Sequence, residues 1–183
     1  MKRLVEILFR TLEVRSPGTA SHCRRVAELA LEIAKRMDLS SKESDCVYLG
    51  GLLHDLGKLG VKDTILDKPN SLTEQEFSEV KRHPELGAKI LMAMEELRVL
   101  VPLVKHHHEA FDGSGYPLGL VGQEIPLGAR IICVADVYEA MTSDRPYRLA
   151  LSEETARIYL LRYRGIKFDP DVVDAFYRVL RGK

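Results

Sequence analysis

The chain has 183 residues, of which 45% are hydrophobic and 30% are charged. A chain of this size buries enough apolar surface to fold without disulfides, which predicts a single domain over residues 1–183. Lys and Arg together number 27, and so do Asp and Glu. This balance excludes an overall field that would attract polymeric nucleic acid or an acidic membrane.

Two features of the sequence favour the cytoplasm. No run of about 18 apolar residues is present to cross a membrane, and Glu6 and Glu13 interrupt the N-terminal apolar pattern, unlike in a cleavable signal. The cysteines, Cys23, Cys46 and Cys133, are odd in number and widely spaced, which disfavours a disulfide framework or a paired-cysteine zinc site. We therefore expect a protein of the reducing cytoplasm.

Helical periodicity dominates the N-terminal part of the chain. Apolar residues recur at helical spacing over residues 1–15 and 26–37, which predicts two amphipathic helices. A third helix is expected over about residues 42–56, with Gly57 as a natural stop. Residues 59–72 contain Gly, Pro, Asn and Ser, so this segment is predicted to be a loop.

The later elements are also predicted to be helical. Thr73 and Glu76 have the spacing of a capping box, which predicts a helix towards residue 82, and Pro84 suits the first turn of the next helix, to about residue 96. Further helices are expected from Leu97 through residues 106–109, and over about 127–141, 153–164 and 170–180. Residues 112–128 hold five glycines and two prolines, which predicts a long loop of a kind that is usually functional. Neither a β-hairpin nor a repeat is evident, so we predict an all-α fold.

Three polar positions interrupt otherwise apolar stretches. His54 and Asp55 form an adjacent imidazole and carboxylate pair at the end of the apolar segment 49–53. An unpaired charge there would be costly to bury, so the pair indicates either a hydrogen-bonded helix terminus or a metal site. Asp136 interrupts the apolar run 131–135, and a core carboxylate requires a cation or several donors.

Two adjacent histidines, His107 and His108, precede the glycine-rich loop. Adjacent residues on a helix differ in direction by about 100°, so both can serve one site only if the helix ends there. The alternative for the run 106–108 is a solvated polar segment.

Several motifs in chain order resemble the HD superfamily of metal-dependent phosphohydrolases, and in particular its HD-GYP branch, which forms an all-helical HD-type bundle. The single positions in that pattern are His22, His54, Asp55, His83, His107, His108 and Asp136. The longer matching segments are His54–Lys58, His107–Glu109, Asp112–Pro117, Val134–Tyr138 and Ser143–Arg148. The resemblance covers about residues 12–180, so we expect no separate sensor or receiver domain within this sequence.

The resemblance implies an enzyme that hydrolyses cyclic di-GMP to linear pGpG and, in some members, onward to GMP. It assigns His22, His54, Asp55 and Asp136 to one divalent metal ion and His83, His107 and His108 to a second, with Asp55 as a catalytic bridge between them. Imidazole and carboxylate ligands suit iron or manganese, with zinc as an alternative. A hydroxide bridging two such ions would attack phosphorus.

The same resemblance implies contacts to the substrate. Lys58 is expected to be catalytic and to contact phosphate, while Arg145 and Arg148 would bind phosphate with their guanidinium groups. Each of these cations is otherwise an ordinary surface residue. Gly115 would let the loop backbone approach the ligand. Tyr116 would place its ring near a guanine, unless it serves only to anchor the loop on the domain.

Some positions depart from the family pattern. Members with a third metal carry an acidic residue about one turn before the first histidine, where this chain has Gly18, so two metals are favoured. Glu139 stands where Asp is common and would affect the ligands only indirectly. His106 stands where an aromatic residue is common and is not included among the metal ligands.

We therefore predict a cytoplasmic, metal-dependent cyclic di-GMP phosphodiesterase. One alternative is an HD phosphohydrolase for other nucleotides or another cyclic dinucleotide, which would not need the loop around Gly115, Tyr116 and Pro117. Another is a non-catalytic module that binds a cyclic dinucleotide or docks a partner, which would have lost metal ligands. In a docking role the loop would contact a partner such as a diguanylate cyclase domain.

Overall fold

The computed structural model describes residues 1–68, 70–144 and 149–181. The α-helices are α1 (Lys2–Arg15), α2 (Pro17–Arg36), α3 (Ser41–Leu53), α4 (Asp63–Leu66), α5 (Glu74–Val80), α6 (His83–Met92), α7 (Val101–His106), α8 (Leu127–Thr142), α9 (Glu153–Arg162) and α10 (Pro170–Arg181). Short 3₁₀ helices are η1 (Leu56–Gly60), η2 (Glu95–Leu100) and η3 (Gly122–Glu124). Within the described ranges there are isolated β-bridges but no strand, which confirms the all-α prediction. None of the helices described is both long and apolar enough to cross a bilayer.

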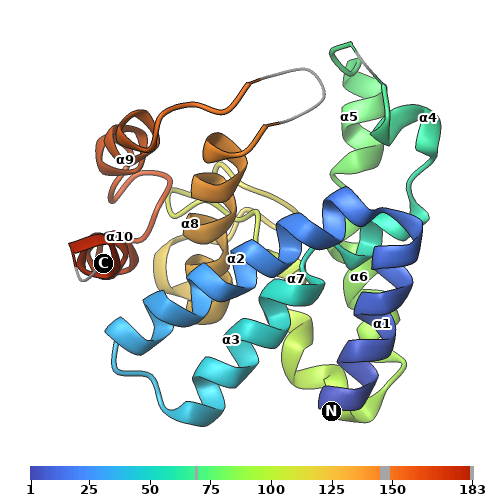
Figure 1. Ribbon diagram of the computed structural model, residues 1–183, viewed down its shortest axis with the longest axis horizontal. Coiled ribbons are helices and arrows are strands. Elements are labelled where there is room, and N and C mark those ends of the chain that lie inside the picture. Colours follow the sequence, from blue (N-terminus) through green and yellow to red (C-terminus); the bar gives the residue numbers. More distant parts are fainter. Residues whose placement is uncertain (69, 145–148, 182–183) are drawn as a thin grey trace.

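Helix α2 is the central element of the bundle, and it contacts α1, α3, α8 and α10 (Figure 1). Small side chains line much of its buried surface, including Ala20, Ala27 and Ala30. These residues let neighbouring helices approach closely. Gly51 on α3 does the same, because a Cβ there would lie 2.8 Å from the Cα of Ala27.

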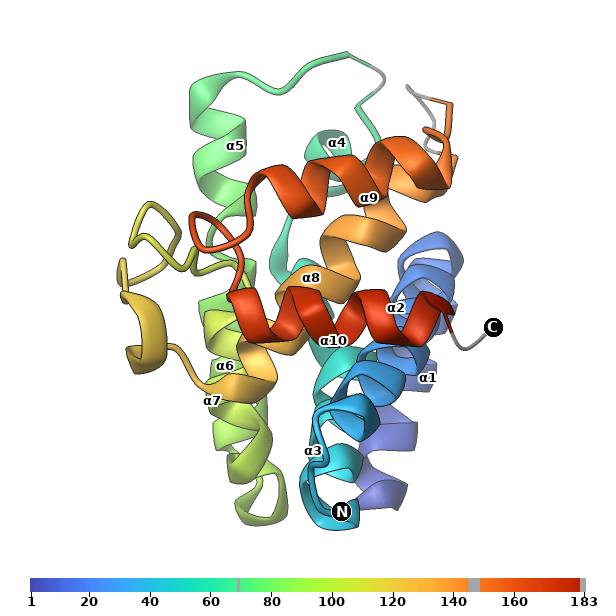
Figure 2. The ribbon, with the colours of Figure 1, turned by 90° about the vertical axis from the view of Figure 1, so that its left-hand side faces the viewer.

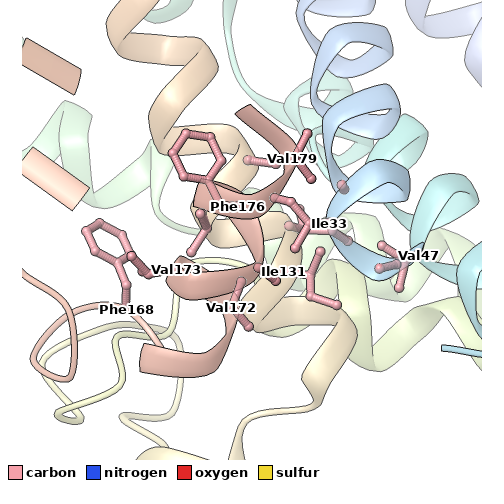
Figure 3. Close-up of a cluster of buried hydrophobic side chains, with 14 of the residues drawn as sticks. Ile33, Val47, Ile131, Phe168, Val172, Val173, Phe176 and Val179 are labelled. Carbon is pink, nitrogen blue, oxygen red and sulfur yellow. The ribbon is translucent and has the colours of Figure 1, made fainter. Parts of the chain in front are cut away.

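The larger hydrophobic cluster joins α2, α3, α8 and α10 (Figure 3). Helix α10 has the most one-sided apolar pattern, with Val172, Val173, Phe176 and Val179 buried at helical spacing. These side chains pack with residues such as Ile131 of α8. Helices α9 and α10 both contact α8, and they run across it in the view of Figure 2.

A second cluster packs α1 against α2 and α3. Val5, Phe9 and Leu12 of α1 follow the spacing of one helix face and meet Leu53 and Leu56. This contact places the residues that directly follow α3 beside α1 and α2. The segment His54–Asp55 is therefore held by core packing on both sides.

Helix α5 stands at one end of the molecule beside α4, as the two views in Figures 1 and 2 show. None of its residues is buried. The predicted capping box is present: the Thr73 side chain accepts from the Glu76 amide, and the Glu76 carboxylate accepts from the Thr73 amide at 2.7 Å. Lys68 donates to both Glu76 oxygens, at 2.8 and 2.6 Å. A helix this short is not stable alone, so these contacts hold it in place.

Several predicted boundaries are wrong for identifiable reasons. The segment expected to be a loop, residues 59–72, contains the end of η1 and the single turn α4, which is anchored by the buried Ile65. The helix expected to run to about residue 96 ends at Met92, and the one expected from Leu97 begins as an α-helix only at Val101. Pro102 explains the restart, because proline is tolerated in the first turn of a helix and not in its interior.

Candidate metal centre

The predicted metal ligands meet from separate parts of the chain. His22 lies on α2, His54 and Asp55 follow α3, His83 begins α6, His107 and His108 follow α7, and Asp136 lies on α8. All but His108 and Asp136 belong to the buried polar residues of the protein. The Asp136 side chain is 13% exposed. Polar groups gathered at this depth require partners.

The ligand atoms form two groups with Asp55 between them. Those of His22, His54 and Asp136 lie within 4.8 Å of one another, and so do those of His83, His107 and His108. Asp55 Oδ2 lies 3.8 Å from His22 Nε2 and 3.6 Å from His54 Nε2, whereas Oδ1 lies 3.3 Å from His83 Nε2. The two oxygens of one carboxylate thus face different imidazole groups, as a bridging ligand requires.

Backbone carbonyls orient three of the imidazoles. The Nδ1 atoms of His54, His83 and His107 donate to the carbonyl oxygens three residues earlier, at 2.8, 2.7 and 2.7 Å. These carbonyls belong to the last turns of α3, α5 and α7, where the helix leaves them without an internal partner. Each Nε2 atom therefore carries the lone pair and faces the other ligands.

Two further observations indicate that the histidines and aspartates of this centre can bind a metal ion. His54 Nε2 is buried and, among the described residues, has no hydrogen-bond partner. A buried nitrogen without a partner is costly, and coordination removes that cost. A set of imidazole nitrogens and carboxylate oxygens is also a suitable donor set for divalent ions such as iron, manganese and zinc.

Local backbone structure brings the second group together. Helix α7 ends at His106, so the condition set by the sequence is met, and the ring centroids of His107 and His108 are 4.0 Å apart. Gly57 lets η1 approach the start of α6, because a Cβ there would lie 1.8 Å from the His83 carbonyl oxygen. The approach positions His83 beside Asp55.

His22 is held by a network of side chains. Its Nε2 lies 3.0 Å from Asp136 Oδ1, and its Nδ1 donates to Glu139 Oε2. The other Glu139 oxygen accepts from Arg25 Nε at 2.6 Å and from the Ser143 hydroxyl at 2.7 Å. Glu139 therefore fixes the orientation of an imidazole that lies in the middle of a helix.

The pKa of His22 in the first group is raised, whereas the pKa values of the three histidines in the second group are lowered. Burial lowers the pKa of His22, but hydrogen bonds with Asp136 and Glu139 outweigh it and raise this pKa to about 9. Burial lowers the pKa of His83 and of His107, and it lowers the pKa of His108 to about 3. The second group thus consists of neutral imidazoles, the protonation state that metal coordination requires.

A cleft of about 930 Å³ opens at this centre and is lined on one side by His22, Asp55 and Lys58. The Lys58 ammonium donates to Asp55 Oδ2 at 2.6 Å. Burial raises the pKa of Asp55, but the adjacent positive charge of Lys58 outweighs it and holds this pKa well below its usual value. The volume lies within the range of small-molecule sites. The side chain of Lys58 is 23% exposed and lines the cleft.

The glycine-rich loop contacts the centre from the side of His108. The Tyr116 ring lies 4.9 Å from the His108 ring, centroid to centroid, with the planes tilted by 32°. Gly115 packs against the backbone, because a Cβ there would lie 2.1 Å from the amide nitrogen of Ala110. Tyr116 thus anchors the loop on the domain, and contacts of Gly115 and Tyr116 with substrate stay predictions.

Two residues near the centre have roles that the sequence did not indicate. The buried Glu109 accepts from the backbone amides of residues 118, 119 and 120, at 2.8, 3.0 and 3.2 Å, and so fixes the glycine-rich loop. Its position between His108 and that loop was the available signal. Cys23 lies with His54 and Asp55 in a third group of potential ligand atoms, and only the packing of α2 on α3 reveals this. His106, which was not predicted to be a metal ligand, lies with its Nδ1 3.4 Å from Glu109 Oε1.

The predicted phosphate contacts Arg145 and Arg148 lie outside the described residues. Their assignment stays a prediction based on the sequence.

The sequence of this chain is similar to those of several phosphodiesterases. The cyclic di-GMP phosphodiesterase response regulator RpfG of Xanthomonas campestris is 42% identical over 173 residues, covering 93% of this chain and 46% of the relative. A cyclic di-GMP phosphodiesterase of Thermotoga maritima is 38% identical, covering 96% of this chain and 48% of the relative. The 3'3'-cGAMP-specific phosphodiesterase 3 of Vibrio cholerae is 36% identical, with 97% and 38% covered. The chain spans less than half the length of these relatives.

Solved structures share the fold. Bd1817, a HDG"Y"P protein from Bdellovibrio bacteriovorus, superposes with a TM-score of 0.72 at 19% identity, over 89% of this chain and 52% of that one. The HD domain of the phosphodiesterase PgpH of L. monocytogenes gives a TM-score of 0.63 at 19% identity, over 96% and 97%. A family model described as HD domain matches residues 6–172. With the clustered histidines and aspartates at its centre, this chain belongs to the HD domain family.

Proposed function

We propose that the chain is a metal-dependent phosphodiesterase that hydrolyses cyclic di-GMP to linear pGpG, with further hydrolysis to GMP at the same centre. The observation that carries the proposal is the buried Asp55 carboxylate, which turns one oxygen towards each of two imidazole groups. The relatives named cyclic di-GMP phosphodiesterases, at 42% and 38% identity, support the choice of substrate.

Two divalent ions fit the proposed chemistry. His22, His54 and Asp136 would hold one ion and His83, His107 and His108 the other, with Asp55 shared between them. Iron or manganese would suit these ligands, with zinc as the alternative. When bound, the ions supply Lewis acidity towards phosphoryl oxygens and lower the pKa of water at the centre.

The residues of the chain would position the phosphodiester. Lys58 lines the cleft beside Asp55, so its ammonium can approach a phosphate oxygen of a substrate in that cleft. Arg145 and Arg148 would hold phosphate in the same complex. Glu139 keeps His22 turned towards Asp136, which preserves the arrangement of the first group.

A second candidate substrate is 3'3'-cGAMP. The specific observation in its favour is the 36% identity to an enzyme named for that dinucleotide. The two substrates share the same phosphodiester chemistry and differ in one purine base. The metal centre therefore serves both, and discrimination between them depends on the walls of the cleft.

The test is hydrolysis by protein purified without chelator, with its metal content measured by elemental analysis. Cyclic di-GMP and 3'3'-cGAMP would be compared by chromatography of the products. We expect metal-dependent formation of pGpG, abolished in Asp55→Ala and preserved in Asp174→Ala, which removes a surface ion pair with Arg164. Metal-loaded protein that binds cyclic di-GMP without cleaving it would instead support the binding module.

The glycine-rich loop would have a second use in docking a diguanylate cyclase domain. Leu118 and Val121 are 58% and 52% exposed and offer an apolar contact. Changing both to serine would then abolish cyclase binding in a pull-down experiment while hydrolysis stays normal.

A further inference from the structure

The cleft is bounded on one side by α5, which projects from one end of the bundle (Figures 1 and 2). Thr73, Glu74, Phe77 and Val80 of this segment line the cleft together with His22, Asp55 and Lys58. Apart from histidine, Phe77 is the one aromatic residue among the described residues of that lining. Ile65, Leu66 and Leu72 add apolar surface to the lining, and Phe77 adds its one large flat ring.

Packing of the protein core does not explain it. Phe77 is 49% exposed, and α5 contributes no buried residue to either hydrophobic cluster. Lys81 lies over the ring with its ammonium 5.1 Å from the centroid, a favourable cation–π distance. Single exposed aromatic residues are ordinary on protein surfaces, but this one lines the same cleft as the candidate metal centre.

Helix α5 links Phe77 to the candidate metal ligand His83. The capping box and Lys68 hold the start of α5, and the Val80 carbonyl at its end accepts from His83 Nδ1. Phe77 lies one turn before Val80. The ring is thus carried by an element whose other end orients an imidazole of the metal centre.

Tyr116, the residue assigned to the base by sequence, has another contact. Its ring packs on His108, and burial raises the pKa of its hydroxyl. A cyclic purine dinucleotide presents two large aromatic faces besides its phosphodiesters. Stacking of a base on an aromatic ring is favourable and tolerates any base.

We propose that Phe77 is the stacking platform for one purine base of the cyclic dinucleotide whose phosphodiester is cleaved at Asp55 and Lys58. The inference rests on the proposed function and adds a base-binding subsite on α5. It assigns Phe77 to substrate binding, so its loss should affect KM more than kcat.

Kinetics with cyclic di-GMP test this assignment. Phe77→Ala should raise KM about 5- to 150-fold, while Phe77→Trp, which keeps a ring, should stay within about threefold of the wild type. Ile158→Ala on α9 is the matched control, because Ile158 is similarly exposed at 57% and does not line the cleft. An unchanged KM in Phe77→Ala would overturn the proposal. So would a loss of metal content or of thermal stability that accounts for the defect, because Phe77 would then serve the fold of α5.

A binding measurement separates this inference from the proposed function. The chain has no tryptophan, so Phe77→Trp introduces a single indole fluorophore. Mixing with cyclic di-GMP should quench it, and should leave the indole of Ile158→Trp unaffected. Quenching without turnover by the wild type would refute the phosphodiesterase activity and keep the platform. Turnover by the wild type without quenching would refute the platform alone.

Discussion

Replacing Glu139 by glutamine should weaken metal binding at His22 while leaving the fold intact. The carboxylate accepts hydrogen bonds from His22, Arg25 and Ser143. Glutamine keeps the shape of the side chain but removes its charge and replaces one acceptor oxygen with a donor. The one remaining acceptor oxygen cannot serve both the imidazole N–H and the guanidinium, which approach different oxygens of the carboxylate, so the contact that turns His22 Nε2 towards Asp136 is weakened.

The structure sets the size of the effect. The side chains of His22 and Glu139 are only 7% and 6% exposed, so solvent screens their interaction little. Loss of such a supporting partner typically costs about 10- to 100-fold in metal affinity, which corresponds to about 1.4–2.7 kcal/mol. Arg25 is 48% exposed, so its contact with Glu139 contributes less, and Arg25→Gln should have a smaller effect.

The assay is a titration of metal-free protein with Mn²⁺ in competition with a chelating indicator. Glu139→Gln should weaken the binding step that involves His22, with a thermal unfolding midpoint close to that of the wild type. Glu139→Asp, which keeps the charge on a shorter side chain, should lie between glutamine and the wild type. Wild-type affinity in Glu139→Gln would refute the reasoning, because His22 would then be oriented without this carboxylate.

Four other outcomes are expected. Asp55→Ala should lose both ions in elemental analysis, since one carboxylate faces both imidazole groups, and retention of full metal content would refute the bridging role. Glu109→Ala should lower the free energy of unfolding in urea by about 2–4 kcal/mol, because three backbone amides lose their acceptor; an unchanged midpoint would show that the loop does not depend on it. Gly57→Ala should reduce both stability and metal content. Gly60→Ala should be tolerated, because its added Cβ meets only the flexible end of a leucine at 3.0 Å. Equal behaviour of the two variants would contradict the close approach of η1 to α6. A chelator should lower the melting temperature by about 5–10 °C relative to protein in Mn²⁺ at about a hundred times its dissociation constant, measured by circular dichroism, and no shift would argue against metal binding by the folded state.

The sequence predicted the fold class and most helices because the apolar residues of α1, α2 and α10 recur on one face of each helix. Boundaries failed where a local signal competed with that pattern. Pro102 divides a segment that the periodicity alone reads as one helix. Ile65 anchors a turn in a segment whose composition predicts a loop. Both residues are visible in the sequence, but their effect depends on what lies next to them in space.

The candidate ligands were identified from the order of the motifs, and the supporting residues were not. Nothing in the spacing from His22 to Glu139 indicates that the two side chains meet, because they lie on different helices and 117 positions apart. The same applies to Cys23, which reaches His54 and Asp55 only through the packing of α2 on α3. Contacts of this kind depend on tertiary structure, which a single sequence does not encode in any local pattern.

The hydrogen bonds of the imidazoles divide the centre into two kinds of position. His54, His83 and His107 stand at helix ends, and each donates to the carbonyl oxygen three residues earlier. The group that orients each of these imidazoles therefore moves together with it. His22 stands inside α2, where the helix itself occupies the nearby carbonyls, and it depends on Glu139 from α8. Displacement of α8 relative to α2 would therefore disturb His22 and leave the three end-of-helix imidazoles correctly turned. The packing of α2 on α8 therefore controls the orientation of His22 separately from that of His54, its partner in the same group, and of His83 and His107.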